Sequence, residues 1–305
     1  MKIKGSIEKI KPVHLFSVFV FALISCTALR FYHCLSYIDV TNGFYRNTDF
    51  TVVLFYVILI ASSLFILAAG FLSASNREFN TQAVHSDKLL GFVSIGLGLS
   101  MLIESVYSIV LGAYSSGYQS AGFSEAMGSG DLPYSLLSFF SFLTAVYFFA
   151  FSVNCFRKKG RIIGRGIFSL LPVGWACTKM IPLFVKQISF TRVSDLVLEI
   201  ALVSFFIMYT LSFAQCCSEV YADVAQWRMT AVGLVTALIS LVLNLPKLTF
   251  TLIGKSEAYV TSGYPISYAE LVFAVFILVL IFATMKKKPE APVTAVTEKG
   301  SSEEV

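Results

Sequence analysis

The feature that most constrains this chain is a series of eight long apolar stretches separated by short polar segments. A helix that crosses the hydrocarbon core of a bilayer needs about 20 apolar residues at about 1.5 Å of rise each. Eight stretches reach that length, at residues 13–31, 51–73, 89–113, 133–156, 165–185, 196–217, 229–252 and 268–285. Because a segment in lipid must satisfy its own backbone hydrogen bonds, each stretch is expected to be a helix. The sequence therefore predicts an all-α, polytopic integral membrane protein with eight transmembrane helices.

Composition indicates the same environment. Hydrophobic residues make up 56% of the 305 residues and charged residues only 13%, whereas about a quarter of the residues in a soluble domain are charged. The net charge of +5 does not indicate a nucleic-acid partner, because the basic residues fall at helix ends and not along one exposed face. We expect the lipid bilayer to be the main partner of the chain.

A dense basic segment at the middle of the chain indicates the orientation. Residues 157–165 contain Arg157, Lys158, Lys159, Arg161 and Arg165, and such segments remain on the cytoplasmic side of a membrane. Placing the N-terminus inside puts most other Lys and Arg residues inside as well. We therefore expect both termini in the cytoplasm and, from the composition and short loops, a bacterial cytoplasmic membrane as the cell membrane concerned.

The basic segment also divides the chain. We expect a first four-helix half at 1–156, a cytoplasmic linking loop at 157–165, a second four-helix half at 166–288 and a disordered cytoplasmic tail at 289–305. The halves align in the same order, for example Cys26-Thr27 with Cys177-Thr178. This predicts two tandem parallel repeats related by an axis along the membrane normal. The alternative, that Leu-, Val- and Phe-rich helices resemble one another by composition alone, stays open.

Two outer segments are distinguished by their composition, and the first helix has a second interpretation. Residues 31–50 are expected to form an aromatic-rich outer loop, and residues 114–132 a Gly- and Ser-rich one. The stretch that ends at Cys26 also has the form of a bacterial lipoprotein signal, which would make Cys26 a lipidated N-terminus. Because the apolar run continues beyond Cys26, we favour a retained helix.

No pattern for a metal, a cofactor or a catalytic set stands out. The six cysteines form no CxxC pair and lie in or beside apolar runs, and the three histidines are scattered. We expect the cysteines to act as small apolar helix residues. An enzyme is accordingly less well supported than a transport or binding protein.

Charged residues within the apolar stretches are the candidate functional groups. They are Glu104, Lys179, Glu199, Lys247 and Glu270. Each costs at least about 2.5 to 3.5 kcal/mol to insert, so such groups usually face a partner or a wet cavity. In the predicted topology all five lie in the outer half of their helices. The repeat alignment places Glu104 beside Lys247, and we expect an ion pair between them.

Proline accompanies two of these charges. The run Asn244-Leu245-Pro246-Lys247 is expected to interrupt its helix, and Lys179 lies between Pro172 and Pro182. Transporters often place substrate and ions beside broken helices. The candidate pathway for a substrate or ion is therefore Glu104, Lys179, Glu199, Asn244 and Lys247.

Two functions of different classes fit these features. The first is a transporter or permease for a small polar or zwitterionic solute, since both signs of charge are present. The alternative is a non-transporting membrane protein, such as a partner subunit, assembly factor or sensor, in which the charges are structural pairs. In that case another membrane protein would be the partner.

Overall fold

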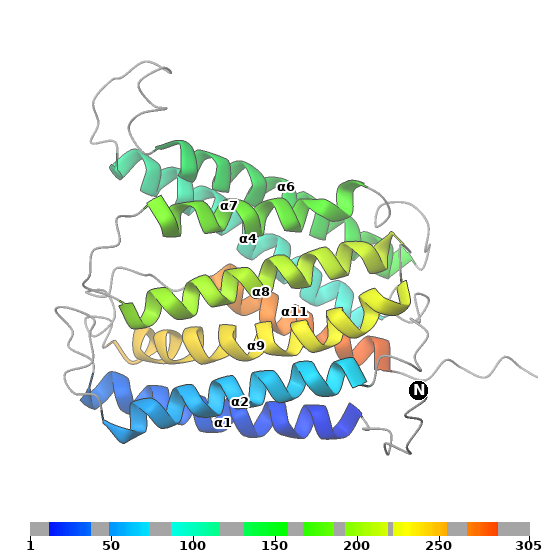
Figure 1. The fold of residues 1–305 in the computed structure, drawn as a ribbon. Helices are drawn as coiled ribbons and strands as arrows, with labels where there is room; N and C mark the ends of the chain where they lie inside the picture. The colour runs from blue at the N-terminus through cyan, green and yellow to red at the C-terminus, as the bar shows by residue number, and fades with distance from the viewer. Residues whose placement is uncertain are drawn as a thin grey trace, which may run out of the picture.

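The chain is a bundle of long helices that run side by side (Figure 1). The structure, a computed structural model, describes residues 12–37, 49–72, 87–115, 131–157, 167–185, 193–218, 222–254 and 267–285. Within these ranges every regular element is helical. The all-α prediction is confirmed for this part of the chain.

Each predicted stretch corresponds to one α-helix. The helices are α1 (Pro12–Ser36), α2 (Phe50–Leu72), α4 (Lys88–Ser115), α6 (Asp131–Arg157), α7 (Leu171–Val185, preceded by the 3₁₀ helix η2, Ile167–Leu170), α8 (Val193–Cys217), α9 (Ala222–Leu252) and α11 (Tyr268–Met285). Seven of these segments are long and apolar enough to cross a membrane, while the apolar part of α11, Tyr268–Thr284, is shorter. The architecture is that of a multi-pass membrane protein, and the count of eight crossings is not confirmed.

Two expectations about helix boundaries are wrong. Helix α1 continues to Ser36, so Phe31 and Tyr32 are helical and not part of an outer loop, because residues 31–36 contain neither Gly nor Pro. Helix α9 is not interrupted at residues 244–247 but passes through Pro246 as one helix. Proline is tolerated in a packed apolar helix because neighbouring helices and Ser or Thr side chains satisfy the backbone groups that it frees.

Several predicted segments lie outside the described residues. They include most of the aromatic-rich outer loop at 31–50, most of the basic loop at 157–165, most of the glycine-rich outer segment at 114–132, and the tail at 289–305.

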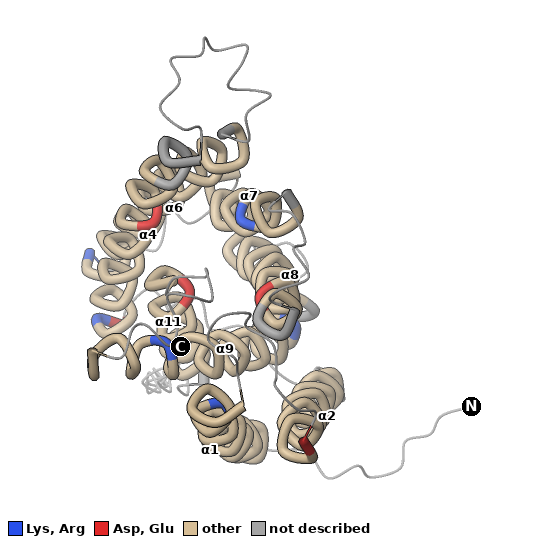
Figure 2. Tube along the Cα trace, turned by 90° about the vertical axis from the view of Figure 1, so that its left-hand side faces the viewer, with Lys and Arg blue, Asp and Glu red and all other residues tan. Residues whose placement is uncertain are grey.

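Six helices close into a ring. Contacts run from α4 to α6, α7, α8, α9 and α11 in turn, and α11 packs against α4 to complete the circle. Helices α1 and α2 pack against each other and against α9, so they lie outside the ring (Figure 2). The first predicted half thus supplies two helices to the ring and the second half supplies four. If an axis related the two halves, α7 and α8 would correspond to α1 and α2 and would also lie outside the ring. They are part of the ring, so the tandem repeat is not confirmed.

Helix α9 is the central element of the bundle. Its residues 231–244 are all buried, because α1, α2, α8 and α11 surround it. Small residues on α9, including Ala231, Gly233 and Ala237, let these neighbours approach closely. Close approach of backbones is the main source of helix association in lipid, where apolar burial gives little driving force.

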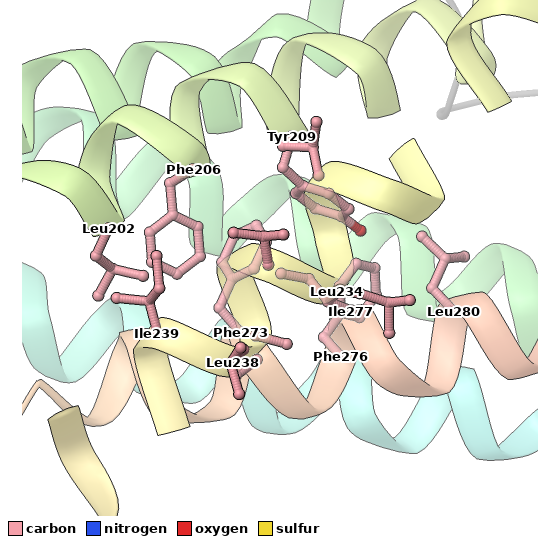
Figure 3. Packing of buried hydrophobic residues seen from close by; sticks show 14 of the residues in the cluster. Leu202, Phe206, Tyr209, Leu234, Leu238, Ile239, Phe273, Phe276, Ile277 and Leu280 are labelled. Atoms are coloured by element: carbon pink, nitrogen blue, oxygen red, sulfur yellow. The ribbon is translucent and has the colours of Figure 1, made fainter. Parts of the chain in front are cut away.

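Aromatic side chains fill the middle of the ring. Trp175 of α7 stacks on Phe273 of α11 with ring centroids 5.5 Å apart and an interplanar angle of 6°. Phe206 of α8 meets both rings edge-on, at 5.6 Å from Trp175 and 5.0 Å from Phe273. Figure 3 shows Phe206 and Phe273 among the packed side chains of α8, α9 and α11. This layer joins three walls of the ring by offset and edge-to-face contacts, which aromatic rings favour.

The outward faces of the bundle are apolar rather than polar. Helix α1 buries Leu15, Phe19 and Ala22 at helical spacing and turns Phe21 and Ile24 outward, 68% and 64% exposed. Exposed apolar side chains likewise cover α2, α4 and α6. A soluble protein rarely exposes apolar surface of this extent, and lipid is the solvent that matches it.

The contact between α2 and α9 gives a test of this packing. A Cβ added at Gly70 would overlap the Cβ of Ala231, which belongs to the rigid core of α9, whereas a Cβ at Gly96 would lie 3.9 Å from Val272 in ordinary contact. We expect Gly70→Ala to destabilise the protein by about 1 to 3 kcal/mol and Gly96→Ala to have little effect. Thermal unfolding in mild detergent measures both, and equal melting temperatures for the two variants would contradict the α2–α9 contact.

Candidate functional site

Five ionisable residues of the ring helices meet at one level of the bundle, toward the end formed by the starts of α8 and α11: Glu104, Lys179, Glu199, Lys247 and Glu270. Figure 2 shows acidic residues on α4, α8 and α11 and a basic residue on α7 around the ring. The charged groups form two sets of ion pairs, one around Lys179 and one between Lys247 and Glu199. We call these residues, with Asn244, Ser240 and Ser267, the ion cluster.

Lys179 is the centre of the first set. Its Nζ lies 2.7 Å from Oε1 of Glu104 on α4 and 2.8 Å from Oε1 of Glu270 on α11. It also donates to Oγ of Ser267 at 2.9 Å. An ammonium group has three N–H donors, and three acceptors surround this one. The side chain therefore spans the interior of the ring with its hydrogen-bonding capacity filled.

Trp175 supports Lys179 from one turn earlier on α7. The Lys179 Nζ lies 5.2 Å from the centre of the Trp175 ring, within the range of a cation–π interaction. Since Trp175 stacks on Phe273, the aromatic layer is in direct contact with the ion cluster. Helix α7 packs mainly against α6 and α8, and it reaches α4 and α11 through these two side chains.

Glu270 connects the first set to α9. Its Oε2 accepts from Nδ2 of Asn244 at 3.1 Å, and Ser240 Oγ donates to the Glu270 carbonyl at 2.9 Å. Asn244 also donates to the carbonyl of Ser240 at 3.1 Å. At the start of α11, the backbone N–H of Glu270 donates to Ser267 Oγ at 3.4 Å, as in a helix cap. The result is a polar seam between α9 and α11.

Lys247 forms the second set with Glu199. Its Nζ lies 3.2 Å from Oε1 of Glu199, which places an ion pair between α9 and α8. The side chain of Lys247 is 3% exposed, and that of Glu199 13%. A lysine so deeply buried depends on its carboxylate partner.

The expected pair of Glu104 with Lys247 is wrong. Glu104 pairs with Lys179, and Lys247 pairs with Glu199. Helix α11 stands between α4 and α9, and helix α6 stands between α4 and α7. Lys179 therefore reaches Glu104 across the interior of the ring and not from a neighbouring helix.

The five residues of the predicted pathway all lie in the ion cluster. Glu104, Lys179, Glu199 and Lys247 contribute charges, and Asn244 joins them through Glu270 from an unbroken helix. The predicted pathway omitted Glu270 and Ser267, because Glu270 is close to the start of its helix and suggested a headgroup position. The spacing Ser267-x-x-Glu270 is a helix-start pattern and would have placed both residues at the first turn of α11.

The chemistry of the cluster is that of charge recognition. It offers carboxylates, ammonium groups, a carboxamide and hydroxyls, which suit polar solutes or protons. Among the described residues no group of three or more His, Cys, Asp or Glu side chains is arranged to hold a metal ion. The six cysteines form no disulfide with one another in the described part of the chain.

A separate polar contact joins α1 to α2 near the same end. Tyr37 Oη donates to Oδ2 of Asp49 at 2.8 Å, and Oδ1 of Asp49 accepts from the N–H of Phe50, the first residue of α2, at 2.7 Å. The hydrogen bonds of Tyr37 with Tyr32 and Asp49 raise the pKa of the Tyr37 hydroxyl. This contact fixes the α1–α2 corner and lies apart from the ion cluster.

Comparison of the chain with protein-family models, with curated proteins and with solved structures gives no match. The functional interpretation therefore depends on the geometry and chemistry of the ion cluster.

A double-mutant cycle tests the second ion pair. Lys247→Met would leave Glu199 as a buried carboxylate without its cation, and removing one partner of a buried pair costs about 3 to 5 kcal/mol. We expect Lys247→Met alone to lower thermal stability strongly, and Lys247→Met with Glu199→Gln to recover most of the loss. Additive effects of the two substitutions, measured by thermal unfolding, would show that the residues do not interact.

Proposed function

We propose that the chain is a transporter or permease of the cell membrane for a small polar or zwitterionic solute. The pathway runs through Glu104, Lys179, Glu199, Asn244 and Lys247, with Glu270 added. The observation that carries the proposal is the position of Lys179, whose ammonium group crosses the interior of the ring to the carboxylates of α4 and α11.

The energetics of buried charge support this proposal. A buried ion pair is often less stabilising than apolar residues of the same volume. A chain that only needed to pack its helices would be at least as stable with Leu or Met at these positions. Groups of both signs in the interior of the ring instead provide exchangeable partners, because the ammonium group of a solute can bind the carboxylates while its anionic group binds a lysine.

The aromatic layer blocks the proposed pathway on one side of the ion cluster. Trp175, Phe206 and Phe273 pack together next to Lys179. A solute that entered at the ion cluster would meet these rings before reaching the other end of the bundle. We assign the layer as the barrier that must rearrange during transport.

We further propose that all eight helices cross the bilayer, with both termini in the cytoplasm of a bacterial cell. Helix α11 packs along α4 and α9, and its 18 residues extend about 27 Å. The first residues of α1 and the last of α11 lie at the same end of the bundle (Figure 1). Lys88, Arg157 and Arg228 are near that end in α4, α6 and α9, which agrees with a cytoplasmic placement.

Uptake by reconstituted vesicles tests the proposed transport. With a panel of labelled amino acids, betaines and small polar solutes, we expect the wild type to take up at least one solute. Lys179→Met and Glu104→Gln should reduce that uptake by about tenfold or more, equivalent to about 1.4 kcal/mol. The control is Lys88→Met, an exposed lysine at the opposite end of α4, which should retain wild-type uptake. Equal uptake in all four proteins would exclude the ion cluster as the pathway.

The second candidate function is a non-transporting membrane partner, assembly or sensor protein. The filled hydrogen-bonding capacity of Lys179 favours it, since a fully paired cluster also suits a purely structural role. Under this alternative the same substitutions would lower the yield of folded protein without changing any flux. Purification in mild detergent would then recover a second membrane protein at fixed stoichiometry.

A further inference from the structure

The charges of the ion cluster do not balance. Three carboxylates, Glu104, Glu199 and Glu270, face two ammonium groups, Lys179 and Lys247. If all five are ionised, the cluster has one negative charge in excess. An uncompensated charge in the interior of a membrane protein is costly, so one further positive charge is needed to neutralise the cluster.

The excess negative charge belongs to the carboxylate that has the fewest partners. Both oxygens of Glu270 are engaged, Oε1 by Lys179 and Oε2 by Asn244. Glu199 has a lysine of its own in Lys247. Glu104 shares Lys179 with Glu270, and its Oε2 is buried and has no hydrogen-bond partner among the described residues. The buried carboxylate oxygen of the cluster that lacks a partner therefore belongs to Glu104.

The described neighbours of Glu104 offer no second cation, since the remaining buried cation, Arg30, is on α1, which packs against α2 and α9. The charged groups nearest to Glu104 are Lys179 on α7 and Glu270 on α11. The other two charged residues of the cluster, Lys247 on α9 and Glu199 on α8, pair with each other. The described part of α6, which packs most extensively against α4, contributes the phenol of Tyr134 near Tyr107 of α4. Lys179 is thus the only cation among the described residues that touches Glu104, and Glu270 also binds it.

We propose that Glu104 is the proton-binding residue of the ion cluster. A proton from the aqueous phase forms an O–H bond at Oε2 of Glu104 and leaves by the same bond, with no other bond changed. The occupant is a proton because Oε2 is enclosed by protein atoms and a proton requires no additional space. A metal ion would need several further oxygen ligands, which the described residues do not supply at this point.

The consequence of this inference, coupling of solute transport to proton binding, rests on the proposed function. A protonated Glu104 holds Lys179 less strongly than an ionised one, so proton binding would loosen the contact between α7 and α4. Lys179 would then remain paired with Glu270 alone. Binding of the proton and opening of the outer end of the ring would be linked through one hydrogen bond.

Infrared difference spectroscopy on the protein in lipid nanodiscs tests the inference without any solute. Between mildly acidic and mildly alkaline buffer, we expect the wild type to gain and lose the C=O stretch of a buried carboxylic acid. Glu104→Gln should remove that band at every pH, while Glu199→Gln and Glu270→Gln, which also remove the excess negative charge, should retain a band that appears only at lower pH. If Glu104→Gln does not fold, Glu104→Asp serves in its place and should shift the frequency of the band.

A band that is absent from the wild type, or that is unchanged in Glu104→Gln or Glu104→Asp, would overturn the inference. If the band responds to sodium at constant pH and ionic strength, and not to pH, the ion that binds Glu104 is a metal ion. That result would also overturn the inference. Failure of the proposed function is distinguishable from these outcomes. If no solute is taken up but the band still responds to pH, transport is excluded and proton binding stands. If a solute is taken up but the band is absent, proton binding is excluded and transport stands.

Discussion

The structure depends on how one ammonium group is neutralised inside an apolar bundle. Lys179 lies in α7, which packs mainly against α6 and α8, and its partners Glu104 and Glu270 lie in α4 and α11. The ion pairs therefore join walls of the ring whose backbones are not in extensive contact. At this end both signs of charge must be present together, because a lone lysine or carboxylate at that depth would destabilise the fold.

The interior of the ring has two layers with different physical properties. The ion cluster is made of directional contacts that can exchange partners, and the aromatic layer is made of rings that interlock, such as Trp175 on Phe273. The two layers touch where Lys179 lies over Trp175. A change of partner at Lys179 would therefore act directly on the packing of the aromatic layer. Helices α1 and α2 lie outside this arrangement, against α9, and support the ring rather than line it.

Most of the fold could be predicted from hydropathy, because a membrane helix is defined by its own apolar length. Every helix in the described residues overlaps a predicted stretch, and the charged residues were expected at a common level, where the structure joins them. The partners could not be predicted in the same way. Glu104 was matched to Lys247 from a sequence alignment of the two halves, whereas its partner Lys179 is determined by which helices face each other across the ring.

The sequence indicates which segments are helices more clearly than it indicates how those helices are ordered in the bundle. The small residues of α9, such as Ala231 and Gly233, are consistent with its central place but do not specify its four neighbours. Pro246 suggested a break that the packed environment of α9 prevents. Glu270 was underestimated because its position near a helix start was taken as a sign of exposure, although it is 5% exposed.

The central claim is that Lys179 is bound at once by Glu104 and Glu270 across the ring. Solid-state NMR on protein in lipid bilayers, with isotope labels on lysine Nζ and glutamate Cδ, measures this contact directly through the dipolar coupling between the two nuclei. The account predicts strong coupling of one lysine to two glutamates, which disappears in Lys179→Met and falls to a single glutamate in Glu104→Gln. A lysine signal in the wild type that couples to one glutamate only, or a pattern unaffected by Lys179→Met, would contradict it.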